Sequence, residues 1–189
     1  MDKNLGLFGG TFDPIHYGHL GIAELFLEKC NLEKCIFIPA KVSPFKIQNK
    51  DVLYSSNERF NLIKKAIAYN PKFEISDFEI NNENEISYSI NTIRYFYSKY
   101  SNYKLFFLIG TDQALNFNKW KEYDNILKIV QVVIANRPEK ISEAERKIIN
   151  EIFDNKEIWL NNKIFSVTAT EIRKKLKKNG EKFNYTIKN

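Results

Sequence analysis

The sequence predicts an α/β fold in which a doubly wound parallel sheet is covered by helices on both faces. Three observations support this prediction. Short apolar runs alternate along the chain with helical segments, as they do in repeated strand–helix units. Residues 105–109 are apolar at every position, which is typical of a central parallel strand. The first apolar run, residues 5–8, ends in Gly9-Gly10, which predicts a tight loop directly after a strand.

The predicted elements follow one another in regular order. Strands are expected at residues 5–8, 35–38, 73–80, 105–109, 130–135 and 163–167. Helices are expected at residues 18–30, from 55 onward, at 89–100, 142–153 and 168–178, with short helical segments between 110 and 127. Ser55 and Glu58 have the spacing of a capping box, and Ser142 is expected to cap a later helix. Residues 39–54 contain two prolines and three lysines and are expected to form an exposed loop.

Length and composition predict a single soluble domain. A chain of 189 residues, of which 43% are hydrophobic and 28% charged, can bury one core and is too short for two large domains. We therefore expect one domain over residues 1–189, with a small helical C-terminal part from about residue 166. No apolar segment reaches the ~18 residues of a membrane span, no signal peptide is apparent, and Cys30 and Cys35 are expected to be free thiols. These features predict a cytoplasmic protein.

The formal net charge of +6 leaves two classes of partner open. Basic surface attracts phosphate, so nucleic acid and a small phosphorylated substrate are both compatible with it. The only dense basic run, residues 173–178, falls on a predicted helix and could equally be a solvated helix face. A nucleic-acid-binding module would also need base-stacking aromatic residues among its surface lysines, and no such motif is visible.

The most informative segment surrounds the only two histidines of the chain. Gly9 and Gly10 follow a predicted strand and let the backbone approach a ligand closely. The helix that begins near Gly18 points its free N–H groups and positive dipole end at the same place. His16 and His19 add donors that can be cationic near neutral pH. These residues predict an anion site suited to phosphate; a simple turn with structural histidines, or part of a metal site, are the alternatives.

Two motifs resemble the signatures of one enzyme superfamily. Residues 9–19, with the sequence GGTFDPIHYGH, resemble the signature of the nucleotidyltransferases with an HxGH motif. Residues 167–173, with the sequence VTATEIR, resemble the second motif of that superfamily, usually written ISSTxIR. The two motifs occur in the expected order and at the expected separation. The resemblance implies a Rossmann-like, three-layer α/β/α fold and a nucleotidyl-transfer reaction.

The middle of the chain narrows this resemblance to the bacterial nicotinate-nucleotide adenylyltransferases. The supporting segments are IP at 38–39, SPFK at 43–46, SYS at 87–89, IGTD at 109–112, WKEY at 120–123 and NRP at 136–138. The resemblance implies transfer of the adenylyl group of ATP to nicotinate mononucleotide, giving nicotinate adenine dinucleotide and pyrophosphate in NAD biosynthesis. It implies no nucleic-acid or membrane partner, and a homo-oligomer is compatible with it.

Three alternatives are kept beside this interpretation. A sibling enzyme could act on nicotinamide mononucleotide or another phosphorylated acceptor. The phosphopantetheine adenylyltransferases usually have Thr where this chain has His16, which argues against that sibling. A basic nucleic-acid-binding module is a more distant alternative, and a non-catalytic nucleotide sensor would not need both His16 and His19.

The resemblance also implies which residues form the site. The mononucleotide phosphate would attack the α-phosphorus of ATP in line, and catalysis would rest on positioning and charge stabilisation, with His16 and His19 as the catalytic residues. The residues expected to bind ATP and its phosphates are Gly9, Gly10, Thr11, Phe12, Gly18, Lys46, Gly110, Asp112, Thr168, Thr170 and Arg173. The residues expected to bind the mononucleotide are Tyr88, Thr92, Asp112 and Trp120. Mg²⁺ would bind the triphosphate, with no dedicated protein ligand.

Several of these residues have a plainer alternative role. Thr168 and Glu171 have the spacing of a capping box, Arg173 could be a surface ion-pair partner, and Trp120 could belong to the core. Lys46 could be a solvated loop lysine. The second motif also has Ala169 where serine is usual, which removes one hydroxyl that could bind phosphate.

Overall fold

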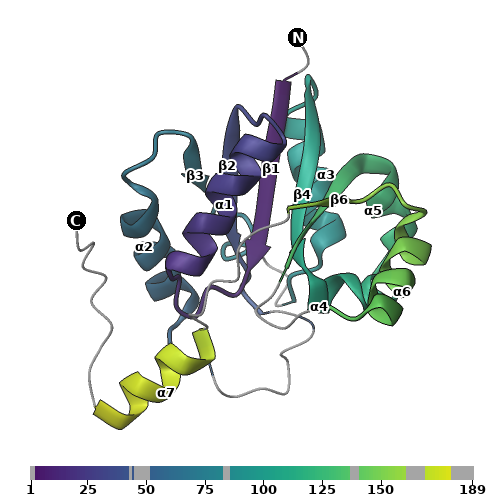
Figure 1. The fold of residues 1–189 in the computed structure, drawn as a ribbon. Coiled ribbons are helices and arrows are strands. Elements are labelled where there is room, and N and C mark those ends of the chain that lie inside the picture. The colour runs from purple at the N-terminus through teal and green to yellow at the C-terminus, as the bar shows by residue number, and fades with distance from the viewer. Residues whose placement is uncertain are drawn as a thin grey trace.

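The computed structural model describes residues 3–42, 44, 52–82, 86–136, 141–160 and 169–179, and within these ranges the strands form one six-stranded sheet (Figure 1). The strands are β1 Lys3–Gly10, β2 Lys34–Pro39, β3 Phe73–Ile75, β4 Tyr103–Gly110, β5 Val130–Ala135 and β6 Ile158–Trp159. Their order across the sheet is β3-β2-β1-β4-β5-β6, and every neighbouring pair is parallel. The chain therefore builds the sheet outward from β1 to one edge and then from β4 to the other, which confirms the doubly wound, Rossmann-like fold.

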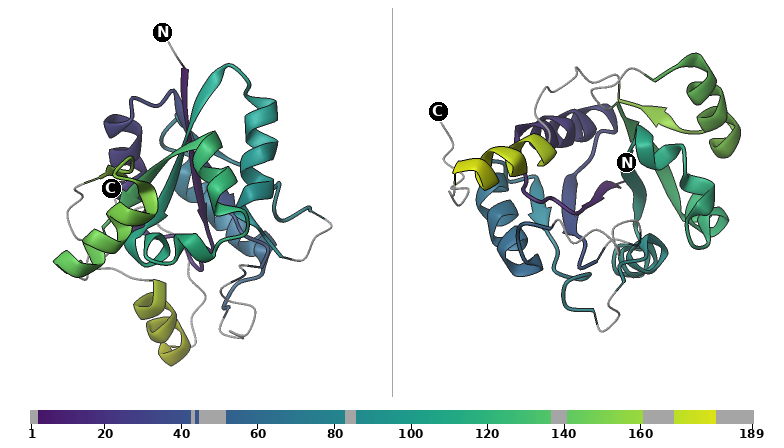
Figure 2. Two further views of the ribbon diagram at one scale, coloured as in Figure 1. Left: turned by 90° about the vertical axis from the view of Figure 1, so that its right-hand side faces the viewer. Right: turned by 90° about the horizontal axis from the view of Figure 1, so that it is seen from below.

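Helices cover both faces of this sheet (Figure 2). They are α1 Tyr17–Lys29, α2 Ser56–Ile67, α3 Ser89–Lys99, α4 Thr111–Ala114, α5 Tyr123–Ile129, α6 Glu143–Phe153 and α7 Ala169–Asn179, with a 3-10 turn, η2, at Phe117–Lys119. Buried residues of α1 and α2 pack on one face, and those of α3, α4, η2, α5 and α6 pack on the other. Helix α7 lies apart from both layers, beyond the carboxyl end of β1 (Figure 1).

The central strands are apolar because they are buried on both faces. In β1, Leu5 and Leu7 belong to the core on the α3 side, whereas Phe8 belongs to the core on the α1 side. All five residues from 105 to 109 in β4 are at most 5% exposed, which confirms the prediction from their apolar run. At Gly6 the packing against α1 and the residues that follow it is so close that a Cβ would lie 2.5 Å from Cδ1 of Leu32 and 2.7 Å from Cε1 of Phe26.

Two predicted helix caps are present. The Ser55 hydroxyl accepts a hydrogen bond from the Glu58 N–H at 3.3 Å, and the Glu58 carboxylate accepts one from the Ser55 N–H at 2.9 Å. Ser142 and Glu145 form the same reciprocal pair at the start of α6. The predicted free thiols Cys30 and Cys35 are both buried.

The predicted strand at residues 73–80 is wrong in its extent, because β3 ends at Ile75. The apolar residues that follow lie outside the sheet, and one of them packs on a helix. The ring of Phe78 stacks on Tyr95 of α3 with 4.1 Å between centroids, and Ile80 is buried. Burial against a helix therefore produced the alternating pattern that resembled a strand.

Other differences concern short or undescribed segments. The two-residue strand β6 was not predicted, because two residues are too few to show a period. The strand predicted at 163–167 lies outside the described residues. Among the residues that the structure describes, no helix is both long and apolar enough to cross a membrane.

Candidate active site

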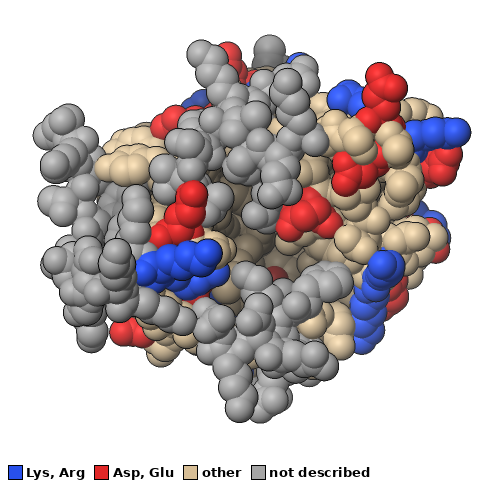
Figure 3. Space-filling view, turned by 60° about the horizontal axis from the view of Figure 1, so that its bottom comes forward, with Lys and Arg blue, Asp and Glu red and all other residues tan. Residues whose placement is uncertain are grey.

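Several of the predicted site residues follow β1 or β4 directly, at the carboxyl ends of these strands, where the strand order reverses. These two strands are neighbours, with Phe8 of β1 beside Leu108 of β4. Ligands of doubly wound sheets bind in the crevice outside such a switch point. The space-filling view toward this end of the molecule shows a hollow in the surface (Figure 3).

The loop between β1 and α1 has an unusual backbone. Phe12 has a φ of 47°, in the left-handed region that few side chains adopt, and the Asp13–Pro14 peptide is cis. The ring of Phe12 packs edge-on against Phe8, with 5.1 Å between centroids. It also lies over Gly10, where a Cβ would come within 3.0 Å of the ring, so only glycine fits that position without a shift.

His16 and His19 are brought together as predicted. His16 is the residue before α1 and is 8% exposed, and His19 lies in the first turn of the helix. The centroids of their rings are 3.7 Å apart. The backbone N–H of His16 donates to Nδ1 of His19 at 3.3 Å. Because Nδ1 accepts this hydrogen bond, the neutral imidazole of His19 carries its proton on Nε2, which can donate to a ligand.

The second motif reaches the first one across most of the chain. Arg173 of α7 donates from one guanidinium nitrogen to the backbone carbonyl of Asp13 at 2.7 Å, across 160 residues of sequence. The same nitrogen lies 3.9 Å from the Asp13 carboxylate, and the other terminal nitrogen donates to the hydroxyl of Thr170 at 3.1 Å. The two motifs therefore meet in one place. Thr168 and Lys46 lie outside the described residues, and so does the capping box predicted for Thr168.

The residues predicted after β4 lie on one short segment. Gly110 ends the strand, and its N–H donates to the side chain of Gln113 at 3.2 Å. Asp112 is exposed in the first turn of α4. Trp120 is half-buried, and its ring packs against that of Phe117 with 4.9 Å between centroids. Trp120 therefore contributes to the core, which is the alternative role named for it above, and part of its side chain stays accessible.

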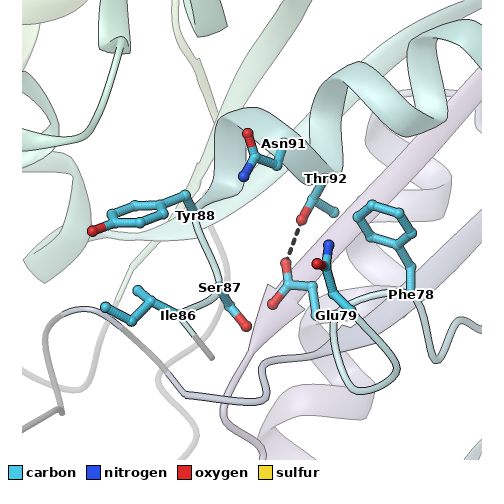
Figure 4. Close-up of a pocket in the computed structure, with 8 residues that line it drawn as sticks. Phe78, Glu79, Ile86, Ser87, Tyr88, Asn91 and Thr92 are labelled. Atoms are coloured by element: carbon cyan, nitrogen blue, oxygen red, sulfur yellow. Dashed lines mark hydrogen bonds between the residues drawn. The ribbon is translucent and has the colours of Figure 1, made fainter. Parts of the chain in front are cut away.

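Tyr88 and Thr92 line a small pocket of about 10 Å³ beside the start of α3, which has room for about one water molecule (Figure 4). Thr92 is 2% exposed, and its hydroxyl donates to the buried carboxylate of Glu79 at 2.6 Å. Burial raises the pKa of Glu79, and hydrogen bonds from Thr92 and Ser87 partly offset that rise. Ser87 in turn accepts a hydrogen bond from the N–H of Lys41 at 3.0 Å. Through this hydrogen bond to Glu79, Thr92 helps to hold the start of α3, where Tyr88 lies.

Sequence reasoning missed Arg59 of α2, which is 2% exposed. Its guanidinium donates to the carbonyls of Thr11 at 2.6 Å, Ala40 at 2.8 Å and Tyr54 at 3.2 Å. Burial lowers the pKa of this guanidinium, and the nearby Asp13 carboxylate raises it. A signal was available, because Arg59 stands four residues before the buried Ile63, on the side of α2 that faces the core.

The buried Asp13 also holds the loop after β1 in place. Its carboxylate is 3% exposed and accepts hydrogen bonds from the N–H groups of Leu53 at 2.8 Å and Tyr54 at 3.0 Å. The Asp13 carboxylate therefore connects the loop after β1 with the residues that precede α2.

Comparison with known proteins gives a consistent family. Residues 7–175 match the model of the cytidylyltransferase-like family. A probable nicotinate-nucleotide adenylyltransferase of Clostridium tetani is 38% identical over 179 residues, which cover 93% of this chain and 88% of the relative. The corresponding protein of Aquifex aeolicus is 34% identical over 169 residues, covering 87% of this chain and 98% of the relative.

A solved structure shows the same fold. The nicotinic acid mononucleotide adenylyltransferase of Plasmodium falciparum complexed with NaAD matches with a TM-score of 0.71 and 20% identity, covering 91% of this chain and 83% of that one. The fold, the two motifs that meet at Asp13 and the relatives of similar length agree with one another. This chain therefore belongs to the cytidylyltransferase-like family and, within it, to the nicotinate-nucleotide adenylyltransferases.

Proposed function

We propose that this enzyme transfers the adenylyl group of ATP to nicotinate mononucleotide, giving nicotinate adenine dinucleotide and pyrophosphate. The observation that carries the proposal is the contact between Arg173 and Asp13, which joins two motifs from opposite ends of the sequence. The names of the relatives and the structure of a relative with NaAD bound support this choice of acceptor.

In this reaction an oxygen of the mononucleotide 5′-phosphate forms a bond to the α-phosphorus of ATP. The bond from that phosphorus to the bridging oxygen of the β-phosphate breaks, and pyrophosphate leaves. Negative charge builds on the phosphate oxygens, so preorganised donors are the main catalytic contribution. The Nε2–H of His19 is such a donor, and the adjacent ring of His16 fixes its orientation from one side. Mg²⁺ would enter bound to the triphosphate oxygens.

Further donors would come from Arg173 and from the loop after β1. Arg173 has five N–H groups, so it can keep its bond to the Asp13 carbonyl and still donate to the β- and γ-phosphates. Gly9, Gly10 and Phe12 would offer backbone N–H groups to the same phosphates. Arg173 and this loop would then hold the triphosphate from two sides.

The acceptor would bind on the other side of the switch point. Asp112 is exposed after β4, where it could accept hydrogen bonds from ribose hydroxyls, and the accessible part of Trp120 could stack on the pyridine ring. The backbone at Tyr88 would contact the pyridine carboxylate. Lys121 lies close to this segment, with its ammonium 4.7 Å from the centre of the Tyr88 ring, and adds positive charge there.

Turnover with ATP and either nicotinate or nicotinamide mononucleotide tests the proposal. We expect pyrophosphate release and a dinucleotide product with nicotinate mononucleotide, and a much lower kcat/KM with the amide. No turnover with the nicotinate form would contradict the proposed function, and equal use of the two acceptors would contradict the stated specificity.

A pair of variants tests the role of His19. His19→Ala should lower kcat by about 10²-fold or more, the size seen when one donor to a developing oxyanion is removed, while the circular dichroism spectrum stays unchanged. Tyr17→Phe is the matched control, because Tyr17 lies in the same turn of α1 and is 53% exposed. A decrease of equal size in both variants would assign the effect to local structure instead of to the imidazole.

A further inference from the structure

Arg59 is an unexpected residue to find in the core on one side of a sheet. Moving a guanidinium out of water is strongly unfavourable unless other groups compensate its charge. The side chain is 2% exposed, and its hydrogen bonds go to backbone carbonyls: those of Thr11, Ala40 and Tyr54, with that of Lys41 more distant at 3.4 Å. An aliphatic residue would fill this position without any such cost.

The carbonyls that Arg59 binds come from three separate segments around the site. Thr11 belongs to the loop after β1, Ala40 follows β2, and Tyr54 precedes α2. The loops after β1 and β2 are also joined directly, because the N–H of Ala40 donates to the carbonyl of Gly10 at 2.9 Å. Arg59 therefore connects these three segments, of which the loop after β1 belongs to the proposed phosphate site.

The shortest of these bonds, 2.6 Å to the carbonyl of Thr11, controls a particular peptide plane. The Thr11 carbonyl and the Phe12 N–H belong to the same planar trans peptide, so they point in opposite directions. When Arg59 holds the carbonyl on the core side, the N–H is turned toward the other side of the loop. Phe12 has a φ of 47°, which is unfavourable for a phenylalanine, so rotation of this peptide would relieve strain if nothing held it.

We propose that Arg59 is a positioning residue that holds the Thr11–Phe12 peptide so that the Phe12 N–H donates to a phosphate of the bound nucleotide. This inference rests on the proposed function and deepens it. The side chain itself does not touch the substrate. Asp13 completes the arrangement, because its buried carboxylate lies near the guanidinium and accepts the N–H of Tyr54, whose carbonyl Arg59 also binds.

The first test uses the unaltered enzyme labelled with ¹⁵N and titrated with pyrophosphate. The Phe12 amide resonance should shift strongly, because a charged acceptor replaces water at that N–H. A Phe12 amide that does not respond at saturating pyrophosphate would overturn the proposal. This result does not depend on turnover, so it separates the proposal from the proposed function.

The second test compares Arg59→Lys and Arg59→Gln with Ile63→Val. Ile63 lies one turn further along α2, is fully buried and belongs to the apolar cluster on the α1 side of the sheet, so its variant controls for loss of stability. Lysine keeps the charge but lacks the planar fork that reaches several carbonyls, and glutamine removes the positive charge. Each Arg59 variant should lower kcat/KM for ATP by about 10²-fold, the effect of losing one oriented donor, and should abolish the Phe12 response.

The two classes of variant separate positioning from stability. Kinetics are measured well below each melting temperature, where all variants are folded. Ile63→Val should keep kcat/KM within about threefold of the parent enzyme even when its melting temperature falls, because it leaves the loop intact. Arg59 variants whose kinetic constants match those of Ile63→Val would overturn the proposal. If the parent enzyme itself shows no turnover, that result would instead contradict the proposed function.

Discussion

Gly6 and Gly9 lie three residues apart in β1, and their replacement by alanine should have opposite effects. A Cβ at Gly6 would lie 2.5 Å from Leu32 and 2.7 Å from Phe26, and these side chains are 3% and 0% exposed. Neither neighbour can swing into solvent, so the added methyl must displace packed core atoms. Overpacking of this kind costs about 1–3 kcal/mol, and two contacts below 3.0 Å place Gly6→Ala at about 2–3 kcal/mol.

Gly9→Ala provides the matched control. There the nearest atom to a Cβ is a ring carbon of Phe107 at 3.7 Å, which is ordinary van der Waals contact. The substitution also restricts the unfolded chain, which stabilises a protein by about 0.4–1 kcal/mol where the native backbone tolerates alanine. We therefore expect the two variants to differ by about 3 kcal/mol, or roughly 6–12 °C in melting temperature for a chain of this size.

Urea unfolding followed by circular dichroism measures this difference. Both variants should unfold in a single transition with the same slope, so that the midpoints compare directly. Free energies of unfolding that agree within about 1 kcal/mol would refute the reasoning, because they would mean that α1 moves away from β1 without cost. Activity is assayed separately, since Gly9 also belongs to the proposed phosphate site.

Three further predictions follow from buried and exposed groups. Burial raises the pKa of Glu79 above its ordinary 4.5, so above that pH the folded state binds more protons than the unfolded state, and stability should fall as pH rises from about 4.5. Glu79→Gln should remove this fall. The prediction is contradicted if the urea midpoints of the parent protein and of the variant change in the same way from pH 5 to 8. Burial raises the pKa of the Cys30 thiol to about 11 and also raises that of Cys35. Iodoacetamide at pH 8 should therefore leave both thiols unmodified in the native protein and modify both in guanidinium chloride, which mass spectrometry measures. Rapid labelling of the native protein would contradict their burial. Arg94 and Glu122 form an exposed ion pair at 2.6 Å, and Arg94→Met should leave the melting temperature unchanged, so a clear decrease would show that the pair is stronger than its exposure indicates.

Much of the fold could be predicted because its signals are local. The strand predicted at residues 130–135 matches β5 at both ends, because most of its residues are apolar and β-branched and the polar Asn136 follows it. The caps at Ser55 and Ser142 were visible in the spacing of a hydroxyl and a glutamate. The segment 73–80 was misjudged because alternation reports burial on one side and does not tell a sheet from a helix as the neighbour.

The residues of the candidate site also fall into two groups, those with a local sequence signal and those without one. Residues that would touch the phosphates, such as His16 and His19, carry recognisable motifs, and the structure places them together. Arg59 and Glu79 act on the surrounding structure instead: Arg59 binds the Thr11 carbonyl in the loop after β1, and Glu79 accepts a hydrogen bond from Thr92 of α3. Such roles depend on which segments become neighbours in space, and the sequence contains that information for Arg59 only as an unexplained charge on the buried face of a helix.

The strand order has a consequence for how the protein emerges during synthesis. β1 pairs with β4, and Lys3 lies opposite Tyr103. The ribosome therefore synthesises β1 100 residues before the strand that pairs with it. At about 5–20 residues per second this interval lasts roughly 5–20 s. During that time one hydrogen-bonding edge of β1, whose residues 5–8 are buried in the folded protein, stays without its partner, and chaperone demand should be greatest before residue 110 has left the ribosome. Arg173 then joins the loop at Asp13 as one of the last contacts to form, so competence to bind the triphosphate arises only late in translation.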